Sequence, residues 1–177
     1  NVIRGTQATS AVLNLLINRA EFYSSLNEIG KAQEDYREAG TLLSSSSPQH
    51  LESVISAGTG ICALQEGDLT KARNIERNLG DLPEEWTFDP SVIASFKAEM
   101  FRMRGDLRSA AGLLGEIADT VKHRFVTAWL KLTLQRTRYL RRIAKTESIG
   151  LAKEGAEMAR FLGLSIRQSE FERLLED

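Results

Sequence analysis

Apolar residues recur along this chain at the three- and four-residue spacing of amphipathic helices. Leu16, Ala20 and Tyr23 follow one another at such intervals, and Ala32 and Tyr36 continue the pattern after a short polar break. Only 3 prolines interrupt the chain, so long stretches are free to be helical. The pattern predicts helices at residues 8–25, 28–43, 48–66, 69–80, 90–104, 107–120, 122–142, 147–162 and 166–176.

The predicted helices form pairs that can be superposed on one small residue of each second helix. These residues are Ala32, Ala72, Ala110 and Ala152. Their spacing near 40 residues is typical of arrays built from repeated helix pairs, and we expect them to be buried at helix crossings. The chain is therefore predicted to be one helical repeat domain, 1–177. Its pairs span about 8–43, 48–80, 90–120 and 122–162, and an extra helix spans 166–176.

The turns inside the pairs carry the clearest local signals. Gly67-Asp68-Leu69 and Gly105-Asp106-Leu107 each place a glycine where a left-handed residue ends a helix. The aspartate that follows is suited to cap the next helix by accepting from its free N–H groups. The turn of the fourth pair lacks glycine and is predicted to be longer, at 143–146.

Three further signals mark helix starts. Ser47-Pro48 and Asp89-Pro90 each suggest an N-cap residue followed by proline at the first helical position. Ser165, with Gln168 three residues later, fits a capping box at the start of the last helix.

The residues around these turns resemble the tetratricopeptide pattern, in which a small residue and an aromatic precede the turn and an alanine and an aromatic follow it. The matching residues are Leu16, Ala20, Tyr23, Ala32, Tyr36 and Ala39 in the first helix pair, Gly60, Gly67 and Ala72 in the second pair, Ala98, Phe101, Gly105, Ala110 and Leu114 in the third pair, and Trp129, Tyr139 and Ala152 in a degenerate fourth pair. In the second pair Ala63 and Glu76 replace the aromatics. The resemblance covers residues 10–163 and implies an all-α, right-handed solenoid of about four antiparallel helix pairs.

The same resemblance implies a concave surface formed by the first helix of each pair. Its polar and mixed lining would be Asn14, Ile17, Glu21, Ser24, Gln65, Ser95, Glu99 and Arg102, with Val54, Ala57, Ile61 and Val92 beside them. This lining lacks the lysines and asparagines of a carboxylate clamp, so recognition of chaperone tails is not indicated. A protein or peptide is the expected partner.

The segment Glu157–Leu164, together with repeats near 40 residues, is similar to the helical sensor segments of MalT-like transcriptional activators of the LuxR class. That resemblance implies a bacterial regulatory segment that binds an inducer or a regulatory protein, while other domains bind ATP and DNA. The chain begins at Asn1 without methionine, so we expect it to be part of a longer protein. No direct contact of this segment with nucleic acid is expected. The alternative is a stand-alone scaffold or adaptor that docks protein partners.

The composition indicates the class of protein but does not indicate a ligand. Hydrophobic residues make up 42% and charged residues 27% of a chain with net charge −1, which is a globular composition without a field for nucleic acid or membrane. No apolar run of about 18 residues is present to span a bilayer. The single cysteine, Cys62, favours a reducing compartment, so a cytoplasmic location is expected.

Charge is unevenly distributed. Residues 97–145 hold 12 Lys/Arg against 4 Asp/Glu. Seven-residue spacing on one long helix would align some of these cations in a stripe. The stripe comprises Arg124, Lys131, Arg138 and Lys145, with Arg141 and Arg142 beside it. Three interpretations remain open. The stripe could be a docking face for an acidic partner or for phosphate, the solvent-exposed side of the helix, or a surface that forms ion pairs with neighbouring acidic repeats.

Few residues suggest chemistry. The two histidines, His50 and His123, fall in different repeats, and Cys62 is interpreted as a small buried hydrophobe because no base stands near it in the pattern. No Cys/His pair has metal-ligand spacing, and Glu34 and Asp35 are interpreted as part of a solvated face. We therefore expect a protein that is not an enzyme and that needs no metal or cofactor.

Two aromatic residues stand in the loop between the second and third pairs. Trp86 and Phe88 lie there beside prolines. Aromatic side chains on an exposed loop often mark an interface. A loop that folds its aromatics back over a helix end is an equal alternative.

Overall fold

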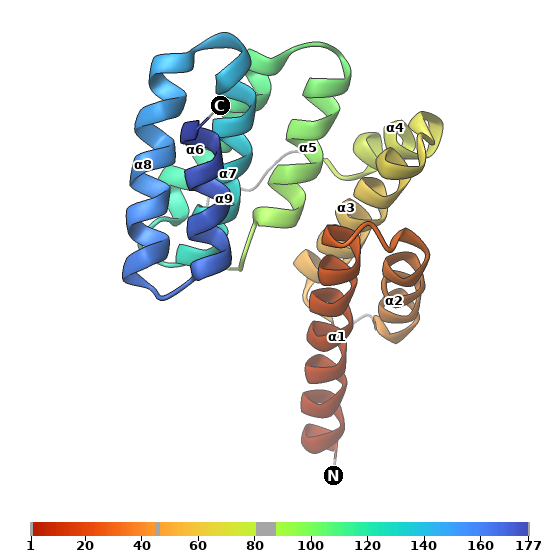
Figure 1. Cartoon of the computed structure of the whole chain (residues 1–177). Helices are drawn as coiled ribbons and strands as arrows, with labels where there is room; N and C mark the ends of the chain where they lie inside the picture. The colour runs from red at the N-terminus through yellow and green to blue at the C-terminus, as the bar shows by residue number, and fades with distance from the viewer. Residues whose placement is uncertain (1, 45–46, 81–87, 177) are drawn as a thin grey trace. The chain divides into compact units, whose positions relative to one another are not determined.

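The fold is all-α. The computed structural model describes residues 2–44, 47–80 and 88–176, with side chains from residue 10 onward, and within these ranges it contains nine helices and no strand (Figure 1). The helices are α1 (Val2–Ser25), α2 (Ile29–Leu42), α3 (Gln49–Glu66), α4 (Leu69–Asn78), α5 (Ser91–Met103), α6 (Leu107–Val121), α7 (Val126–Ile143), α8 (Lys145–Phe161) and α9 (Ser165–Glu176). Each predicted helix is therefore present. The largest differences are at the start of α1, which is longer than predicted, and at the start of α7.

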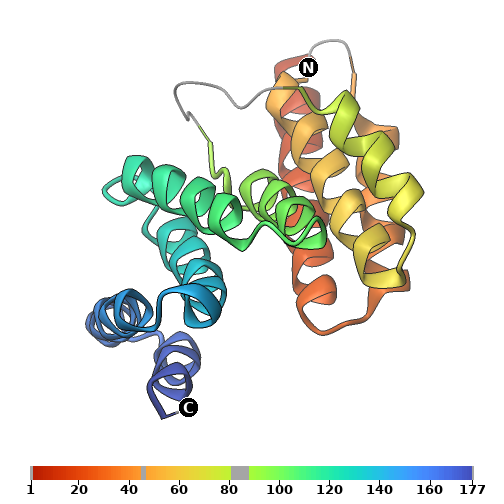
Figure 2. The ribbon, with the colours of Figure 1, turned by 90° about the horizontal axis from the view of Figure 1, so that it is seen from above.

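The chain divides into two compact units, Asn1–Pro83 with α1–α4 and Glu84–Asp177 with α5–α9. In the first unit α2 packs on both α1 and α3, α4 packs on α3, and the first helices α1 and α3 touch. In the second unit α6 lies against α5 and α7, and α8 lies against α7 and α9, as Figures 1 and 2 show for α8 and α9. The first helices α5, α7 and α9 also touch in succession. Each unit therefore repeats one packing rule, while one continuous repeat domain across 1–177 stays a prediction.

The small residues and the two Gly-Asp turns behave as predicted. Ala32, Ala72, Ala110 and Ala152 are all fully buried. Gly67 and Gly105 have φ of +82° and +80°, which an L side chain rarely adopts. Asp68 accepts from the backbone N–H of Lys71 and Asp106 from that of Ser109, each at 2.9 Å, so both aspartates cap the second helix of their pair.

The fourth turn was predicted wrongly. Only Ala144 separates α7 from α8, in place of a long connection at 143–146. Its N–H donates to the carbonyl of Leu140 and its own carbonyl accepts from Ser148, so one residue ends the first helix and begins the second. Its φ of −153° is extended backbone, which explains why no glycine is needed.

None of the three predicted helix-start signals is met in full. Asp89 accepts from the N–H of Ser91 at 2.8 Å, but α5 begins at Ser91, so Pro90 precedes the helix and is not its first residue. Ser47 instead accepts from the backbone N–H of Ser44, and α3 begins after Pro48 without a side-chain cap. Ser165 is already helical, and the Gln168 side chain donates to Glu172.

The second helix of one pair meets the first helix of the next at a glycine. In the first unit a side chain at Gly58 of α3 would collide with the ring of Tyr36 of α2. In the second unit Gly155 of α8 has the same relation to the ring of Phe171 of α9, and Gly115 of α6 to the guanidinium of Arg136 of α7. A missing side chain on one helix therefore makes room for a large one on the other.

The turn glycines give a direct test of this geometry. Gly105→Ala should lower the free energy of unfolding by about 1–2 kcal/mol, because alanine is strained at positive φ. Gly112→Ala is the matched control on α6, where an added methyl meets nothing within 4 Å. We expect this control to be neutral or stabilising by about 0.5–1 kcal/mol through helix propensity. Urea unfolding followed by circular dichroism measures both, and equal effects would contradict the left-handed turn.

Candidate functional site

The first helices of the first unit are joined by a reciprocal pair of hydrogen bonds. The Ser24 hydroxyl donates to the Gln65 side-chain oxygen at 2.9 Å, and the Gln65 amide donates back to the Ser24 carbonyl at 3.1 Å. Two residues predicted for the concave surface, from α1 and α3, are thus brought together. Asn14 is exposed and Glu21 half-buried on the same helix as Ser24.

Five of the predicted lining residues are buried instead. Ile17 is only 5% exposed, and Val54, Ala57, Val92 and Ser95 are likewise buried. Their predicted exposure is wrong because these side chains pack between helices. The accessible part of the surface is therefore formed by the remaining polar residues, with the half-buried Ile61 beside them.

In the second unit a polar cluster joins α5 to α7 and centres on Glu99. One carboxylate oxygen accepts from the Nε of Arg102 at 2.5 Å. The other accepts from the hydroxyl of Tyr139 at 2.5 Å and from the side-chain amide of Gln135 at 3.2 Å. Both oxygens are satisfied, so the cluster links the two first helices and fixes the orientation of Arg102.

The electrostatics of this cluster keep its donors protonated. Burial, and then the hydrogen bond to Glu99, raise the pKa of Tyr139 well above its ordinary value. The hydrogen bond to Glu99 likewise raises the pKa of Arg102. The phenol and the guanidinium therefore remain hydrogen-bond donors to one carboxylate throughout the physiological pH range.

Two serines of α5, Ser91 and Ser95, lie between the Glu99 cluster and the start of the helix. Lys131 of α7 donates to the Ser91 hydroxyl at 3.2 Å. Ser95, one turn further along α5, is 6% exposed, and its hydroxyl has no hydrogen-bond partner among the described residues. Sequence reasoning identified Ser95, Glu99 and Arg102 but not Gln135 or Tyr139 as their partners. Treating α7 as the next first helix and extending the groove pattern onto it would have found both.

The basic stripe is not one helical face. Arg124 lies in the turn before α7, Lys131 and Arg138 lie on α7, and Lys145 is the first residue of α8. The seven-residue spacing assumed a helix through 124–145, and the helix ends at Ile143. The prediction of a single stripe is therefore wrong.

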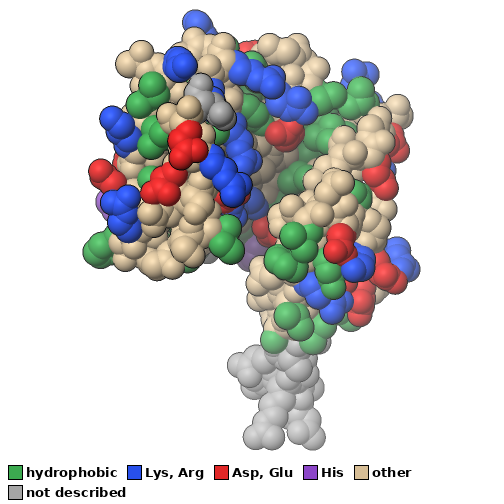
Figure 3. All heavy atoms as spheres, in the orientation of Figure 1, with side chains coloured by type: hydrophobic (Ala, Val, Ile, Leu, Met, Phe, Trp, Pro, Cys, Tyr) green, Lys and Arg blue, Asp and Glu red, His purple; other side chains and the backbone are tan. Residues whose placement is uncertain are grey.

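These cations nevertheless differ in what they contact. Arg138 pairs with Glu170 of α9 at 3.6 Å, and Arg124 lies over the ring of Phe125. Arg142 and Lys145 are exposed, and no carboxylate in the described part of the chain lies within ion-pair distance of either. Figure 3 shows Lys and Arg side chains gathered at the end of the second unit that carries the α5–α6 and α7–α8 turns. Excess positive charge therefore remains at that end.

An ion pair that sequence reasoning missed lies between α1 and α2. Asp35 is buried, and Arg19 contacts both of its oxygens at 2.7 Å. Placing Asp35 on a solvated face was therefore wrong. Its spacing from the buried Ala32 and Ala39 is the signal that could have located it.

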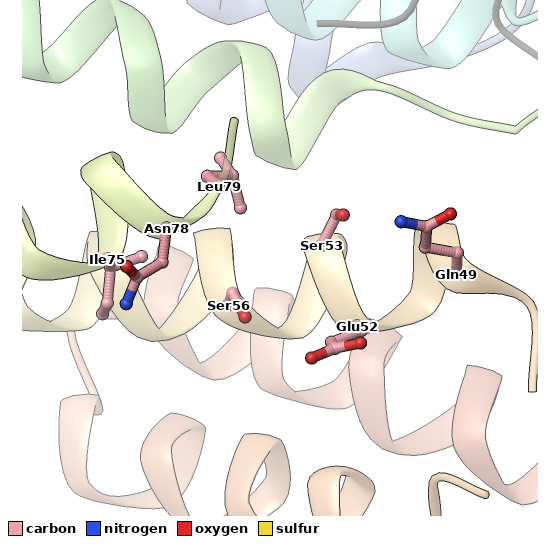
Figure 4. A pocket seen from close by; sticks show the side chains of 7 residues that line it. All are labelled: Gln49, Glu52, Ser53, Ser56, Ile75, Asn78 and Leu79. Carbon is pink, nitrogen blue, oxygen red and sulfur yellow. The ribbon is translucent and has the colours of Figure 1, made fainter. Parts of the chain in front are cut away.

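Two open pockets lie on the first unit, and neither contains a predicted lining residue. One lies between α3 and α4 and is shown in Figure 4. It is lined by Gln49, Glu52, Ser53, Ser56, Ile75, Asn78 and Leu79. The other is lined by Gly30, Gln33, Glu34, Arg37, Thr59 and Lys71. Hydroxyls, amides and charged groups in these linings can form hydrogen bonds with a ligand.

No known family, curated protein or solved structure matches this chain.

Within the described residues, no group of three or more His, Cys, Asp or Glu side chains is placed to hold a metal ion. None of the helices in the described ranges combines the length and apolar character needed to cross a bilayer. Trp86 lies outside the described residues, and Phe88 is half-buried.

Cys62 is fully buried on α3, and burial raises its pKa to about 11. We expect its reaction with a disulfide reagent at pH 8 to be at least about 100-fold slower than in denaturant, because two pKa units lower the thiolate fraction about 100-fold. The folded pKa exceeds the unfolded one, so this group stabilises the fold below pH about 9 and ceases to do so as the pH rises toward 11. Absorbance of the released thiolate measures the rate. Equal rates in native and denatured protein would contradict the burial of Cys62.

Proposed function

We propose that this chain is a binding module of tetratricopeptide-like repeats, and that it serves as the sensor segment of a bacterial regulator similar to the MalT-like activators. The observation that carries the proposal is the repeated side-by-side contact of first helices, α1 with α3 in one unit and α5 with α7 and α9 in the other. Such contacts create surfaces on which side chains from successive repeats lie next to one another.

The chemistry of these surfaces favours binding over catalysis. Ser24 and Gln65 in one unit, and Gln135 and Arg102 in the other, offer amide, hydroxyl and guanidinium groups held by neighbouring side chains. Such groups suit the backbone and polar side chains of a peptide. The thiol of Cys62 is buried and protonated, so the strongest nucleophile of the chain is not available for catalysis. A reducing compartment such as the cytoplasm fits a protein that keeps this thiol free.

Positive charge at one end of the second unit adds a property to the proposed partner. Arg142 and Lys145 lie at this end, and no acidic side chain among the described residues is within ion-pair distance of either. An acidic partner would gain both affinity and a faster encounter from these charges. We therefore propose an acidic protein or peptide as the partner. A small inducer remains the alternative that the MalT-like resemblance implies.

Reversing these two charges tests the proposal. Arg142→Glu with Lys145→Glu should weaken capture of the acidic partner at least about tenfold and leave the melting temperature nearly unchanged, because exposed unpaired charges contribute little to stability. Proteins retained from the source cell on the immobilised variant and on wild type are compared by quantitative mass spectrometry, at low and raised salt. Lys153→Glu, an exposed change on α8, is the control. Identical sets of retained proteins on all three would refute an acidic partner at this end.

A second experiment separates a sensor from a stand-alone scaffold. In the gene that encodes the chain, a sensor segment requires a nucleotide-binding domain before it and a helix-turn-helix domain after it. The full-length protein should then lose inducible transcription from a reporter when Arg142 and Lys145 are reversed. A gene that ends without these domains would support the scaffold.

A further inference from the structure

The helices α5 and α7 lie side by side in a fixed register within the second unit. Near the start of α5, Lys131 donates to Ser91, and the two residues are 40 positions apart. Two turns further along, Tyr139 donates to Glu99 across the same separation of 40. An equal offset at both places means that the helices run parallel, so each residue of α5 has its neighbour on α7 40 positions later.

This register brings two exposed apolar residues together where the helices end. Met103 is the last residue of α5 and Ile143 the last of α7, and each is 42% exposed. They follow Glu99 and Tyr139 by four residues, which is about one helical turn, and they keep the same offset. The two side chains therefore occupy neighbouring positions at the end of the unit that carries the α5–α6 and α7–α8 turns.

Cations surround this apolar pair. Arg102 and Arg142 directly precede its two members in the chain and are themselves equivalent in the register. The turns and helix starts that follow add the exposed Arg104, Arg108 and Lys145. An apolar centre within a polar rim is the usual anatomy of a protein interface.

The acidic side chains near this end are already engaged. Glu99 accepts hydrogen bonds within its own cluster, Asp106 caps α6, and Glu147 forms an ion pair with another cation of α7. Among the described residues, no carboxylate lies within ion-pair distance of Arg142 or Lys145. The charge at this end is therefore available to a partner.

Charge and apolar surface together define the chemistry of that partner. A purely acidic surface would pair with the cations but leave Met103 and Ile143 in water. A purely apolar segment would cover these two side chains but desolvate the cations beside them, which is costly. Insertion into a membrane surface relies on a broader apolar face than two half-exposed side chains. A protein segment with one large apolar residue between acidic residues satisfies both features.

The residues in question, called here the α5–α7 end, are Met103, Ile143, Arg102, Arg142 and Lys145. We infer that the α5–α7 end binds a short segment of a partner protein in which one large apolar residue is flanked by acidic residues. The apolar side chain packs against Met103 and Ile143, and the carboxylates pair with the surrounding cations. The inference rests on the proposed acidic partner and adds an apolar contact that fixes where the acidic segment binds.

Three short peptides labelled with a fluorophore test the two contacts separately. The first has a leucine between two runs of three glutamates, the second has serine in place of leucine, and the third has glutamines in place of the glutamates. Anisotropy with the full chain should show saturable binding of the first peptide, at least about fivefold tighter than the second, because only leucine buries apolar surface. The third should bind at least about tenfold more weakly than the first, because its charge is lost.

Met103→Gln with Ile143→Gln tests the apolar contact on the chain itself. This double variant should bind the leucine–glutamate peptide no more tightly than the serine peptide, and its affinity for the serine peptide should stay within twofold of wild type. Both side chains are exposed, so the melting temperature should change little. Phe161→Gln with Ile166→Gln is the matched control, since it removes two still more exposed apolar residues near the α8–α9 turn and should leave every affinity within twofold.

The outcomes separate this inference from the proposed function. If the leucine and serine peptides bind wild type equally, and Arg142→Glu with Lys145→Glu abolishes both, the acidic partner stands and the apolar contact is refuted. If the glutamine peptide binds as tightly as the leucine–glutamate peptide, the cations have no role and the proposed acidic partner fails as well.

Three further results would overturn the inference. The first is the absence of saturable binding of any peptide, in which case the capture experiment still judges the proposed function. The second is co-sedimentation with phosphatidylserine vesicles that requires Met103 and Ile143, because the occupant would then be a membrane. The third is a wild-type dimer in sedimentation equilibrium that Met103→Gln with Ile143→Gln dissociates, because the occupant would then be a second copy of the chain.

Discussion

Tyr36→Ala is expected to lower the free energy of unfolding of the first unit by about 3–5 kcal/mol, the range for removing a buried aromatic ring. Tyr36 is 2% exposed, and its ring occupies the space that a side chain at Gly58 would fill. Alanine leaves a cavity between α2 and α3 that the glycine cannot fill. Burial also raises the pKa of Tyr36 well above its ordinary value, so the ring is an uncharged part of the core at any physiological pH.

Three further variants separate the loss of packing from other causes of destabilisation. Tyr36→Phe keeps the ring and should cost less than about 1.5 kcal/mol. Gly58→Ala alone should be destabilising by about 1–3 kcal/mol through collision with the ring. In the Tyr36→Ala background the same change should instead be neutral or stabilising, because the added methyl enters the cavity. Urea unfolding by far-ultraviolet circular dichroism measures all four proteins, and additive effects would show that the two residues do not pack together.

The elements that sequence could predict are those encoded by neighbouring residues. Gly105 and Asp106 end one helix and cap the next through contacts within a few residues, so the turn follows from local chemistry. The buried alanines follow from the 40-residue recurrence, which marks equivalent positions without any knowledge of the partner helix. The nine helices were found for the same reason, since helical periodicity is a local property.

The errors occurred where a distant helix decides. Asp35 was placed in solvent because nothing near it in sequence indicates that Arg19 of α1 reaches it. Ile17 was placed on the groove because a family pattern gives a position without giving the depth at which the side chain packs. The prediction of a basic stripe was wrong for a local reason. Ala144 alone separates α7 from α8, so Lys145 lies on a different helix from Lys131 and Arg138. Of the candidate site, the pairing of Ser24 with Gln65 could have been derived by superposing the two first helices, since both stand near the ends of equivalent helices.

Phe171→Ala is expected to lower the free energy of unfolding of α9 and its contacts by about 3–5 kcal/mol. Phe171 is fully buried, and its ring lies where a side chain at Gly155 of α8 would be. The helix α9 packs on α7 and α8. Phe171 is its buried side chain at this contact, so its ring should supply most of the packing energy of α9. The ion pair of Glu170 with Arg138 is too exposed to replace it.

The fluorescence of the buried Trp129 on α7 reports this change, because detachment of α9 uncovers α7. Gly150→Ala, on the open side of α8, is the control and should be neutral or stabilising. Gly155→Ala should destabilise when Phe171 is present and stabilise when Phe171 is alanine, as a shared space requires. If Phe171→Ala instead costs no more than about 0.5 kcal/mol, α9 is a loosely attached appendage and the second unit ends at α8. A full effect together with the sign reversal at Gly155 would show that α9 is an integral part of the second unit, stabilised by the same packing of a ring against a glycine that joins α2 to α3.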